Sequence, residues 1–224
     1  MIAATLYNLT MIKLALLFLT ILTSIDALEI VQKPIRFSEH RKALSLDYIR
    51  EHYGLDLQEI TIEPRIIVVH YTAIPTLQGS FEAFDSEELP SSRSDISGTH
   101  ASANVSVQYL VGRDGIVYQL MPDNWMARHV IGLNYSSIGI ENVGNLGDLT
   151  PRQLEANIAL IRHIKARHPG IEYLIGHSEY RCFEKSPFWL EKDGNYRTEK
   201  EDPGVQFMQD LRSALPAFKQ APCQ

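Results

Sequence analysis

With 224 residues, the chain is long enough for one ordinary domain with extensions, and its 45% hydrophobic content can build a sizeable core. The formal net charge of −6 argues against a nucleic-acid partner and against adhesion to an anionic membrane surface. Two cysteines, Cys182 and Cys223, are too few for a disulfide framework and lack the paired spacing of a structural metal site. One bridge between them and two unpaired thiols are both compatible with the sequence.

The start of the chain is typical of a secretory signal peptide. Lys13 precedes an apolar run from Leu14 to Leu22, and smaller or polar residues follow as far as Ala27. The apolar run is short for a membrane span, so we expect residues 1–27 to be removed and the protein to be exported, to the periplasm or the extracellular space. A retained anchor helix is the alternative.

Residues 28–59 are expected to form an N-terminal extension ahead of a domain over residues 60–218, with a tail at 219–224. Within the extension, apolar residues between Arg41 and Tyr53 precede Gly54 and predict a short helix with a glycine stop.

The first buried strand is predicted by the apolar run that ends at His70. Residues 73–104 follow, rich in Ser, Pro, Asp and Glu, with little periodicity. This pattern predicts a long loop that lines or covers a cleft, in which His100 is expected to be a surface residue.

The middle of the chain predicts a hairpin and then a helical crossover. Two runs, at 105–111 and 116–121, flank Asp114-Gly115, which is a strong hairpin signal. An apolar run ending at Glu141, a helix opened by Thr150-Pro151 and a run ending at His177 then predict a right-handed βαβ unit. A closing helix is expected at 207–215.

Three apolar runs therefore end in His70, Glu141 and His177. If these runs are neighbouring strands, the three side chains converge on one edge of one sheet, where α/β proteins tend to place their sites. Imidazoles and carboxylates suit zinc, and a catalytic zinc site usually has three protein ligands. Asp202, followed by Pro203-Gly204, is a further candidate ligand.

These segments resemble the type-2 N-acetylmuramoyl-L-alanine amidases, a family akin to peptidoglycan recognition proteins and T7 lysozyme. The matching segments, in the family's order, are VVHYT (68–72), NYSSIGIE (134–141), IGH (175–177) and KEDPG (200–204). The resemblance runs from about Glu63 to the C-terminal helix. It implies an α/β fold with a mixed central β-sheet flanked by helices, and a zinc amidase domain over residues 60–218.

By the same resemblance, Zn²⁺ would be bound by His70, His177 and Asp202, with Glu141 and Lys200 as catalytic residues. His129 matches a histidine that relatives place near the cleft and is expected to contact substrate. Asn134 is expected to contact substrate too, or to cap the turn. Cys182 is a rival to Asp202 as third ligand, because thiolate ligands occur in relatives. Gln108 and Arg128 stand where relatives commonly have histidine and tryptophan, which leaves the substrate preference open.

The function implied is zinc-dependent hydrolysis of the amide bond between N-acetylmuramic acid and L-alanine in peptidoglycan or muropeptides, by a monomer. The alternative from another class is a non-catalytic peptidoglycan-binding module of the same fold. A zinc peptidase is disfavoured because the chain has no His-Glu-x-x-His helix.

Overall fold

The structure is a computed structural model that describes residues 28–91, 93, 96 and 102–223. The predicted signal peptide and His100 lie outside these described residues.

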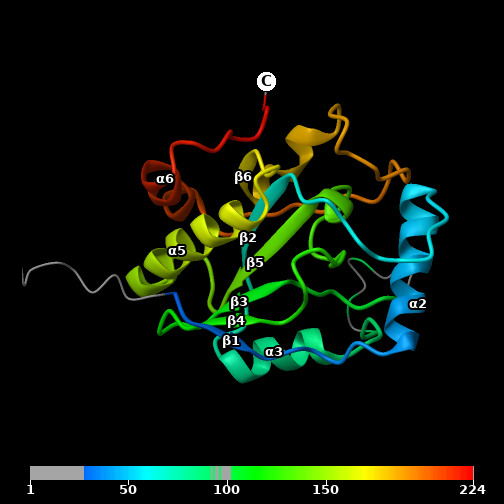
Figure 1. Cartoon of the computed structure of the whole chain (residues 1–224), viewed down its shortest axis with the longest axis horizontal. Coiled ribbons are helices and arrows are strands. Elements are labelled where there is room, and N and C mark those ends of the chain that lie inside the picture. The colour runs from blue at the N-terminus through cyan, green and yellow to red at the C-terminus, as the bar shows by residue number, and fades with distance from the viewer. Residues whose placement is uncertain (1–27, 92, 94–95, 97–101, 224) are drawn as a thin grey trace, which may run out of the picture.

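Six strands form one mixed sheet in the order β1-β4-β3-β5-β2-β6 (Figure 1). All neighbouring pairs are parallel except β3 and β4, which form the predicted hairpin. The strands are β1 (Ile30–Gln32), β2 (Ile66–Tyr71), β3 (Tyr109–Val111), β4 (Val117–Gln119), β5 (Ser137–Asn142) and β6 (Tyr173–Gly176). The predicted mixed α/β fold is confirmed.

The helices of the described residues flank this sheet, with α5 and α6 together on one side and α2 at the opposite end of the molecule (Figure 1). They are α2 (Glu39–Tyr48), which continues as a π-helical turn (Ile49–Tyr53), α3 (Leu77–Asp85), α5 (Pro151–Arg167) and α6 (Val205–Ala214). Short 3₁₀ helices occupy Asn134–Ser136 and His177–Phe183.

Side chains that alternate along the central strands fill two cores, one on each face of the sheet. On one face, residues such as Val69 and Ile140 pack against Leu160 and Ile164 of α5 and Leu211 of α6. The other face is covered by the 130–133 segment and by residues after β6. The buried residues there include Ile66, Val68, Ile175, Val130, Leu133, Tyr180 and Phe183.

Local signals explain where the helices begin and end. The helix α5 opens at Thr150-Pro151, as the sequence predicts, and Thr150 and Gln153 form a reciprocal capping box there. The helix expected from Arg41 begins two residues earlier, because Ser38 accepts a hydrogen bond from the backbone of His40. It ends at Gly54, whose φ of 65° is the left-handed conformation that glycine adopts without strain.

The segment 73–104 differs from the prediction of a long loop, because it contains α3. This helix has only nine residues and buries only Ser80 and Phe84. So narrow an apolar contact gives little periodicity for sequence analysis to detect.

Both ends of the described chain join the sheet. The extension supplies β1 and, through Tyr48 and Tyr53, a core with Ile60 and Ile62. After α6, Lys219 forms a parallel bridge with Tyr173 at the outer edge of β6. A disulfide between Cys182 and Cys223, with Cα atoms 4.7 Å apart, ties this last segment down and decides between the two alternatives left open by the sequence.

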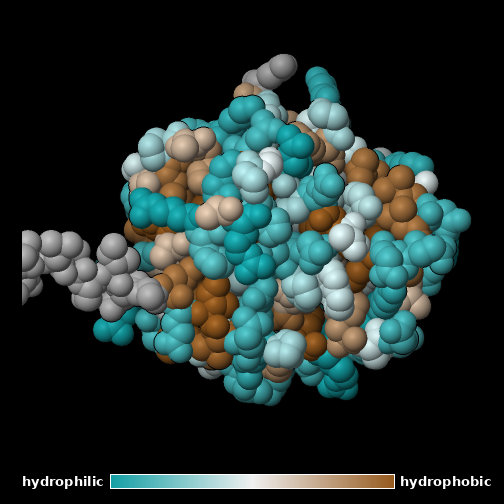
Figure 2. All heavy atoms as spheres, in the orientation of Figure 1, coloured by the Kyte–Doolittle hydropathy of each residue, from teal (hydrophilic) through white to brown (hydrophobic). Residues whose placement is uncertain are grey.

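Hydrophilic side chains cover much of the face drawn in Figure 2 and separate smaller hydrophobic areas. Within the described residues, no helix is long and apolar enough to cross a membrane.

Candidate metal centre and active-site cleft

Three side chains from distant parts of the sequence meet at the carboxyl end of the central strands. They are His70 at the end of β2, His177 directly after β6, and Asp202 in the loop before α6. Nδ1 of His70 lies 2.9 Å from Nδ1 of His177, and Oδ2 of Asp202 lies 3.1 Å from each of these nitrogens. All three residues are buried. The predicted convergence of His70, Glu141 and His177 on one edge of the sheet is confirmed, because Glu141 is the register partner of His70 and His177 contacts His70.

The sheet register explains why the two histidines meet. β2 lies between β5 and β6, and Val69 of β2 is opposite Gly176 of β6. The next residues, His70 and His177, therefore lie side by side. Asp202 reaches the pair because the backbone N–H of Ser178 donates to its carbonyl oxygen at 3.1 Å. A Cβ on Gly176 would lie 2.9 Å from Cδ of Pro203, so glycine lets the Asp202-Pro203 turn approach the strand end.

The donor set fits a zinc ion. Two imidazole nitrogens and one carboxylate oxygen are ligands that zinc takes in catalytic sites, where water holds the fourth position. Tetrahedral ligands with bonds of about 2.0 Å lie roughly 3.3 Å from one another. The spacing of 2.9–3.1 Å between the three donor atoms is close to that value.

The protonation states also suit metal binding. Burial and the neighbouring charge of His70 lower the pKa of His177 to about 4, so its ring is neutral near pH 7. Burial pushes the pKa of Asp202 upward, but the two adjacent histidines outweigh it and hold that pKa well below its usual range. Neutral imidazoles and an ionised carboxylate are the forms that ligate metals.

Glu141 stands beside this cluster without belonging to it. Its Cα is paired with that of His70 across β5 and β2. Burial raises the pKa of Glu141 to about 7, although the charges of His70 and Lys200 act in the opposite direction. Oε2 is buried and has no hydrogen-bond partner among the described residues. A carboxyl with a pKa near neutrality is suited to accept and return a proton.

A cavity of about 570 Å³ opens over the cluster. Lys200 lines it together with Glu141. Part of the lining comes from the 73–104 segment, which confirms the prediction that this segment lines the cleft. Its residues include Ala73, Ile74, Ala83, Phe84 and Arg93.

His129 lines the same cavity and contacts the cluster directly, with its Nδ1 3.0 Å from Nε2 of His70. Asn134 is fully buried, and its Oδ1 accepts from the backbone N–H groups of His129 and Val130 at 2.8 and 2.7 Å. The turn-capping alternative for Asn134 therefore has a structural basis. Substrate contacts by His129 and Asn134 stay predictions.

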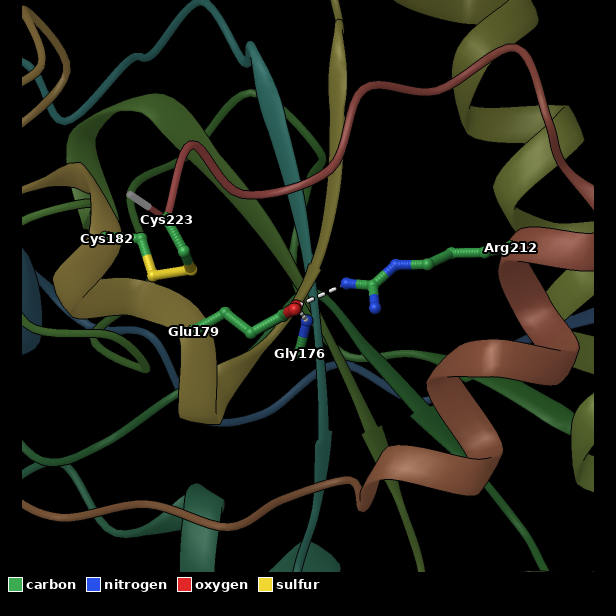
Figure 3. Close-up of a disulfide and its surroundings, with 5 residues drawn as sticks. All are labelled: Gly176, Glu179, Cys182, Arg212 and Cys223. Carbon is green, nitrogen blue, oxygen red and sulfur yellow. Dashed lines mark hydrogen bonds and ion pairs between the residues drawn. A yellow bond between two sulfur atoms is a disulfide. The ribbon is translucent and has the colours of Figure 1, made fainter.

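Cys182 is not available as a metal ligand, because its sulfur is bonded to Cys223. The nearby Glu179 supports the site instead, a role that the sequence analysis missed. Its Oε2 accepts from the backbone N–H of Gly176 at 2.8 Å and from Arg212 of α6 at 2.5 Å (Figure 3). Glu three residues after a strand-ending glycine is the sequence signal that could have indicated this cap.

The two departures from the family pattern have different settings. Gln108 is fully buried, and its carboxamide bonds the backbone of Gly139 and Trp125 at 2.8 Å each, so it serves the sheet rather than the cleft. Arg128 lines the cavity, and its guanidinium donates to the carbonyl of Ile96 and the hydroxyl of Tyr196, both at 3.1 Å. It thereby joins two segments at the border of the cleft.

Comparisons with known proteins give the family and the fold of the chain. Residues 61–205 match the sequence family described as N-acetylmuramoyl-L-alanine amidase. No curated protein matches the chain. Among solved structures, the endolysine N-acetylmuramoyl-L-alanine amidase LysCS from Clostridium intestinale URNW is similar, with 20% identity, a TM-score of 0.50 and coverage of 85% of this chain and 97% of that one. Bumblebee PGRP-SA is similar with 19% identity, a TM-score of 0.50 and coverage of 88% and 99%.

The two structural similarities show the fold, which is shared by amidases and peptidoglycan recognition proteins. The sequence match extends over the strands that carry His70, Glu141 and His177 and over Asp202, and it supports hydrolysis of peptidoglycan amide bonds. The chain belongs to the N-acetylmuramoyl-L-alanine amidase family.

Proposed function

We propose that this family member is a zinc-dependent amidase that cleaves the bond between N-acetylmuramic acid and the L-alanine of the stem peptide. The observation that carries the proposal is the meeting of His70, His177 and Asp202 in one cavity with Glu141. The three donors would hold the zinc, and Glu141 and Lys200 stand beside them without being needed as ligands.

When bound there, zinc would acidify a water molecule and polarise the scissile carbonyl. Glu141 would accept a proton from the attacking water and return it to the leaving amine, for which its pKa of about 7 is suited. The ammonium of Lys200 would stabilise the negative charge that develops on the carbonyl oxygen. His129, which lines the cavity, is the proposed substrate contact within the described part of the cleft, whereas Asn134 is fully buried and would act through the turn that carries His129.

The competing function is a module of the same fold that binds peptidoglycan without cutting it. A complete set of three metal donors and a carboxyl with a raised pKa favours the enzyme, because a binding module needs neither. The two functions are separated by incubating the purified protein with sacculi or muropeptides and measuring free stem peptide. We expect release that a chelator abolishes and added zinc restores; tight binding without release in the presence of zinc would support the binding module.

We further propose that the protein works outside the cytoplasm as a monomer. The signal-like start and the wall substrate support export, and the Cys182–Cys223 disulfide is of the kind that persists in oxidising compartments. Cell fractionation that finds the uncleaved chain in the cytoplasm would contradict export. Light scattering of the purified protein would test the monomeric state.

A further inference from the structure

His129 lies behind His70, on the side away from the proposed metal. Nε2 of His70 points to Nδ1 of His129 at 3.0 Å, and the two rings meet at an interplanar angle of 87°. The other ring nitrogen of His70, Nδ1, faces His177 and Asp202. His129 therefore touches the one ring nitrogen of His70 that does not face the cluster.

The hydrogen bonds continue from His129 in a single direction. Nε2 of His129 is 3.2 Å from Oγ of Ser137, and this hydroxyl donates its proton to the carbonyl oxygen of Leu133 at 2.8 Å. Because a serine hydroxyl has only one proton, Oγ of Ser137 must accept from Nε2–H of His129. Nδ1 of His129 then carries no proton and accepts from Nε2–H of His70. The direction of each hydrogen bond from His70 through His129 and Ser137 to Leu133 is thereby fixed.

The proton arrangement matters because a metal ligand must present a free lone pair. A neutral His70 with its proton on Nε2 has its lone pair on Nδ1, the atom that faces His177 and Asp202. The row that ends on the Leu133 carbonyl thus favours the tautomer of His70 that can ligate. Ser137 was not singled out by sequence analysis, although it lies in the matching segment four residues before Glu141.

The surroundings fix the ring of His129 in this position. The backbone N–H of His129 donates a hydrogen bond to Oδ1 of Asn134 at 2.8 Å. The ring lies directly on β5, where a Cβ on Gly139 would be 2.9 Å from both Cγ and Nδ1 of His129. A glycine at 139 is therefore what allows the ring to approach the strand and reach His70.

We propose that His129 is a positioning residue, which accepts the Nε2–H of His70 and so holds Nδ1 of His70 ready to bind the metal. This inference rests on the proposed metal site and deepens it. Metal-bound histidines generally donate their second ring N–H to a fixed acceptor, and removing such an acceptor typically costs about 10- to 100-fold in metal affinity or activity.

The test is the zinc affinity of purified variants, measured by competition with a chromophoric chelator. His129→Leu removes the acceptor, and we expect its zinc affinity to fall by about 10- to 100-fold. In His129→Asn, the side-chain oxygen is bonded to Cγ, as Nδ1 is in histidine. This oxygen can therefore still accept the hydrogen bond from His70. We expect the zinc affinity of this variant to stay within about threefold of the wild-type value, because His70 keeps an acceptor for its Nε2–H.

Two further variants complete the experiment. Ser137→Ala keeps the His129 ring but removes the acceptor that orients it, and should weaken zinc binding by roughly fivefold even if His129→Leu does not fold. His168→Leu is the matched control, because His168 is likewise a histidine whose ring nitrogen is hydrogen-bonded, to Asp123 at 3.0 Å, but it does not line the cavity over the cluster. Its zinc affinity should equal that of the wild type.

The inference would be overturned if His129→Leu bound zinc with wild-type affinity. If His129→Leu does not fold, wild-type affinity in Ser137→Ala would overturn it. Equal losses in His129→Leu and His129→Asn would overturn it as well, since they would show that ring packing matters and hydrogen-bond acceptance does not. A wild-type protein that binds no zinc would overturn this inference and the proposed function together. A wild-type protein that binds zinc but releases no stem peptide would overturn the amidase proposal alone, and the affinity series would still decide the role of His129.

Discussion

His70 and Glu141 are direct partners across β2 and β5, so a candidate metal ligand and an acidic group leave the sheet next to each other. Their positions follow from register alone, because both terminate apolar strands that run in parallel. The pairing has a cost, since Oε2 of the half-buried Glu141 is itself buried there and has no hydrogen-bond partner among the described residues.

The raised pKa of Glu141 predicts a pH-dependent loss of stability. The folded protein binds the Glu141 proton with a pKa of about 7, whereas an unperturbed glutamate has a pKa of 4.5. Between these values the folded state binds more protons than the unfolded state, so the free energy of unfolding falls as pH rises through this window. Glu141→Gln stays neutral, and we expect it to be more stable than the wild type above pH 7, by at most about 3 kcal/mol.

Urea unfolding in the presence of a chelator would measure this difference at several pH values. The advantage of Glu141→Gln should disappear below about pH 4.5, where both side chains are neutral. A difference that does not change with pH would show that ionisation of Glu141 is not its cause.

The catalytic residues should separate from the metal ligands. Glu141→Ala and Lys200→Ala should fold and bind zinc while losing on the order of a hundredfold or more in rate, the usual effect of removing a positioned acid–base or charge-stabilising group. Single alanine substitutions of His70, His177 and Asp202 should lose the metal together with activity. Zinc content and turnover are measured on the same five preparations, and an Asp202→Ala protein with full zinc and full activity would contradict the assigned ligand set.

Gly139 should tolerate no side chain. A Cβ there would lie 2.8 Å from Cγ2 of Val107 and 2.9 Å from the ring of His129, so Gly139→Ala must shift the strand or displace both neighbours. We expect a destabilisation of about 1–3 kcal/mol, which thermal or urea unfolding would measure. Gly194→Ala is the matched control, because nothing lies within 4 Å of the added methyl group. Equal stability of the two variants would refute the close approach of His129 to β5.

Reduction of the disulfide should destabilise the protein while leaving the metal cluster assembled under native conditions. Cys182 and Cys223 are separated by 41 residues, and closing a loop of this length is worth about 4 kcal/mol in the chain-entropy account. Urea unfolding with and without a reductant measures the effect. A Cys182→Ser/Cys223→Ser double variant should respond to urea alike in both conditions, and an unchanged midpoint for the reduced wild type would contradict the prediction.

The strands and the histidine and glutamate at their ends were predictable because each buried strand is a short apolar run closed by one polar residue. The sequence alone therefore identifies His70, Glu141 and His177 as polar residues at strand ends. The approach of Asp202 was not readable from spacing, since twenty-five residues separate it from His177; the KEDPG segment and its family resemblance carried that prediction.

Other features depend on how separate segments cross in space. The contact between His129 and His70 needs the segment before β5 to fold back over Gly139, and the choice between a bridge and two thiols needs the last residues to reach the 3₁₀ helix after β6. The helix α3 was missed for a local reason, because Thr76 caps it but only two of its residues are buried. Sequence patterns report burial along one element and carry little information on such crossings.

The segment after α6 also bears on the solubility of the protein. It covers the outer edge of β6, where the N–H of Leu174 donates to the carbonyl of Lys219 at 3.0 Å and the N–H of Lys219 donates to the carbonyl of Glu172 at 2.9 Å. Cys223 anchors this cover four residues further on. An uncovered edge strand offers its backbone groups to any other copy of the chain. A protein without the disulfide would therefore associate through the exposed edge of β6. Such a protein would precipitate before its active site is lost.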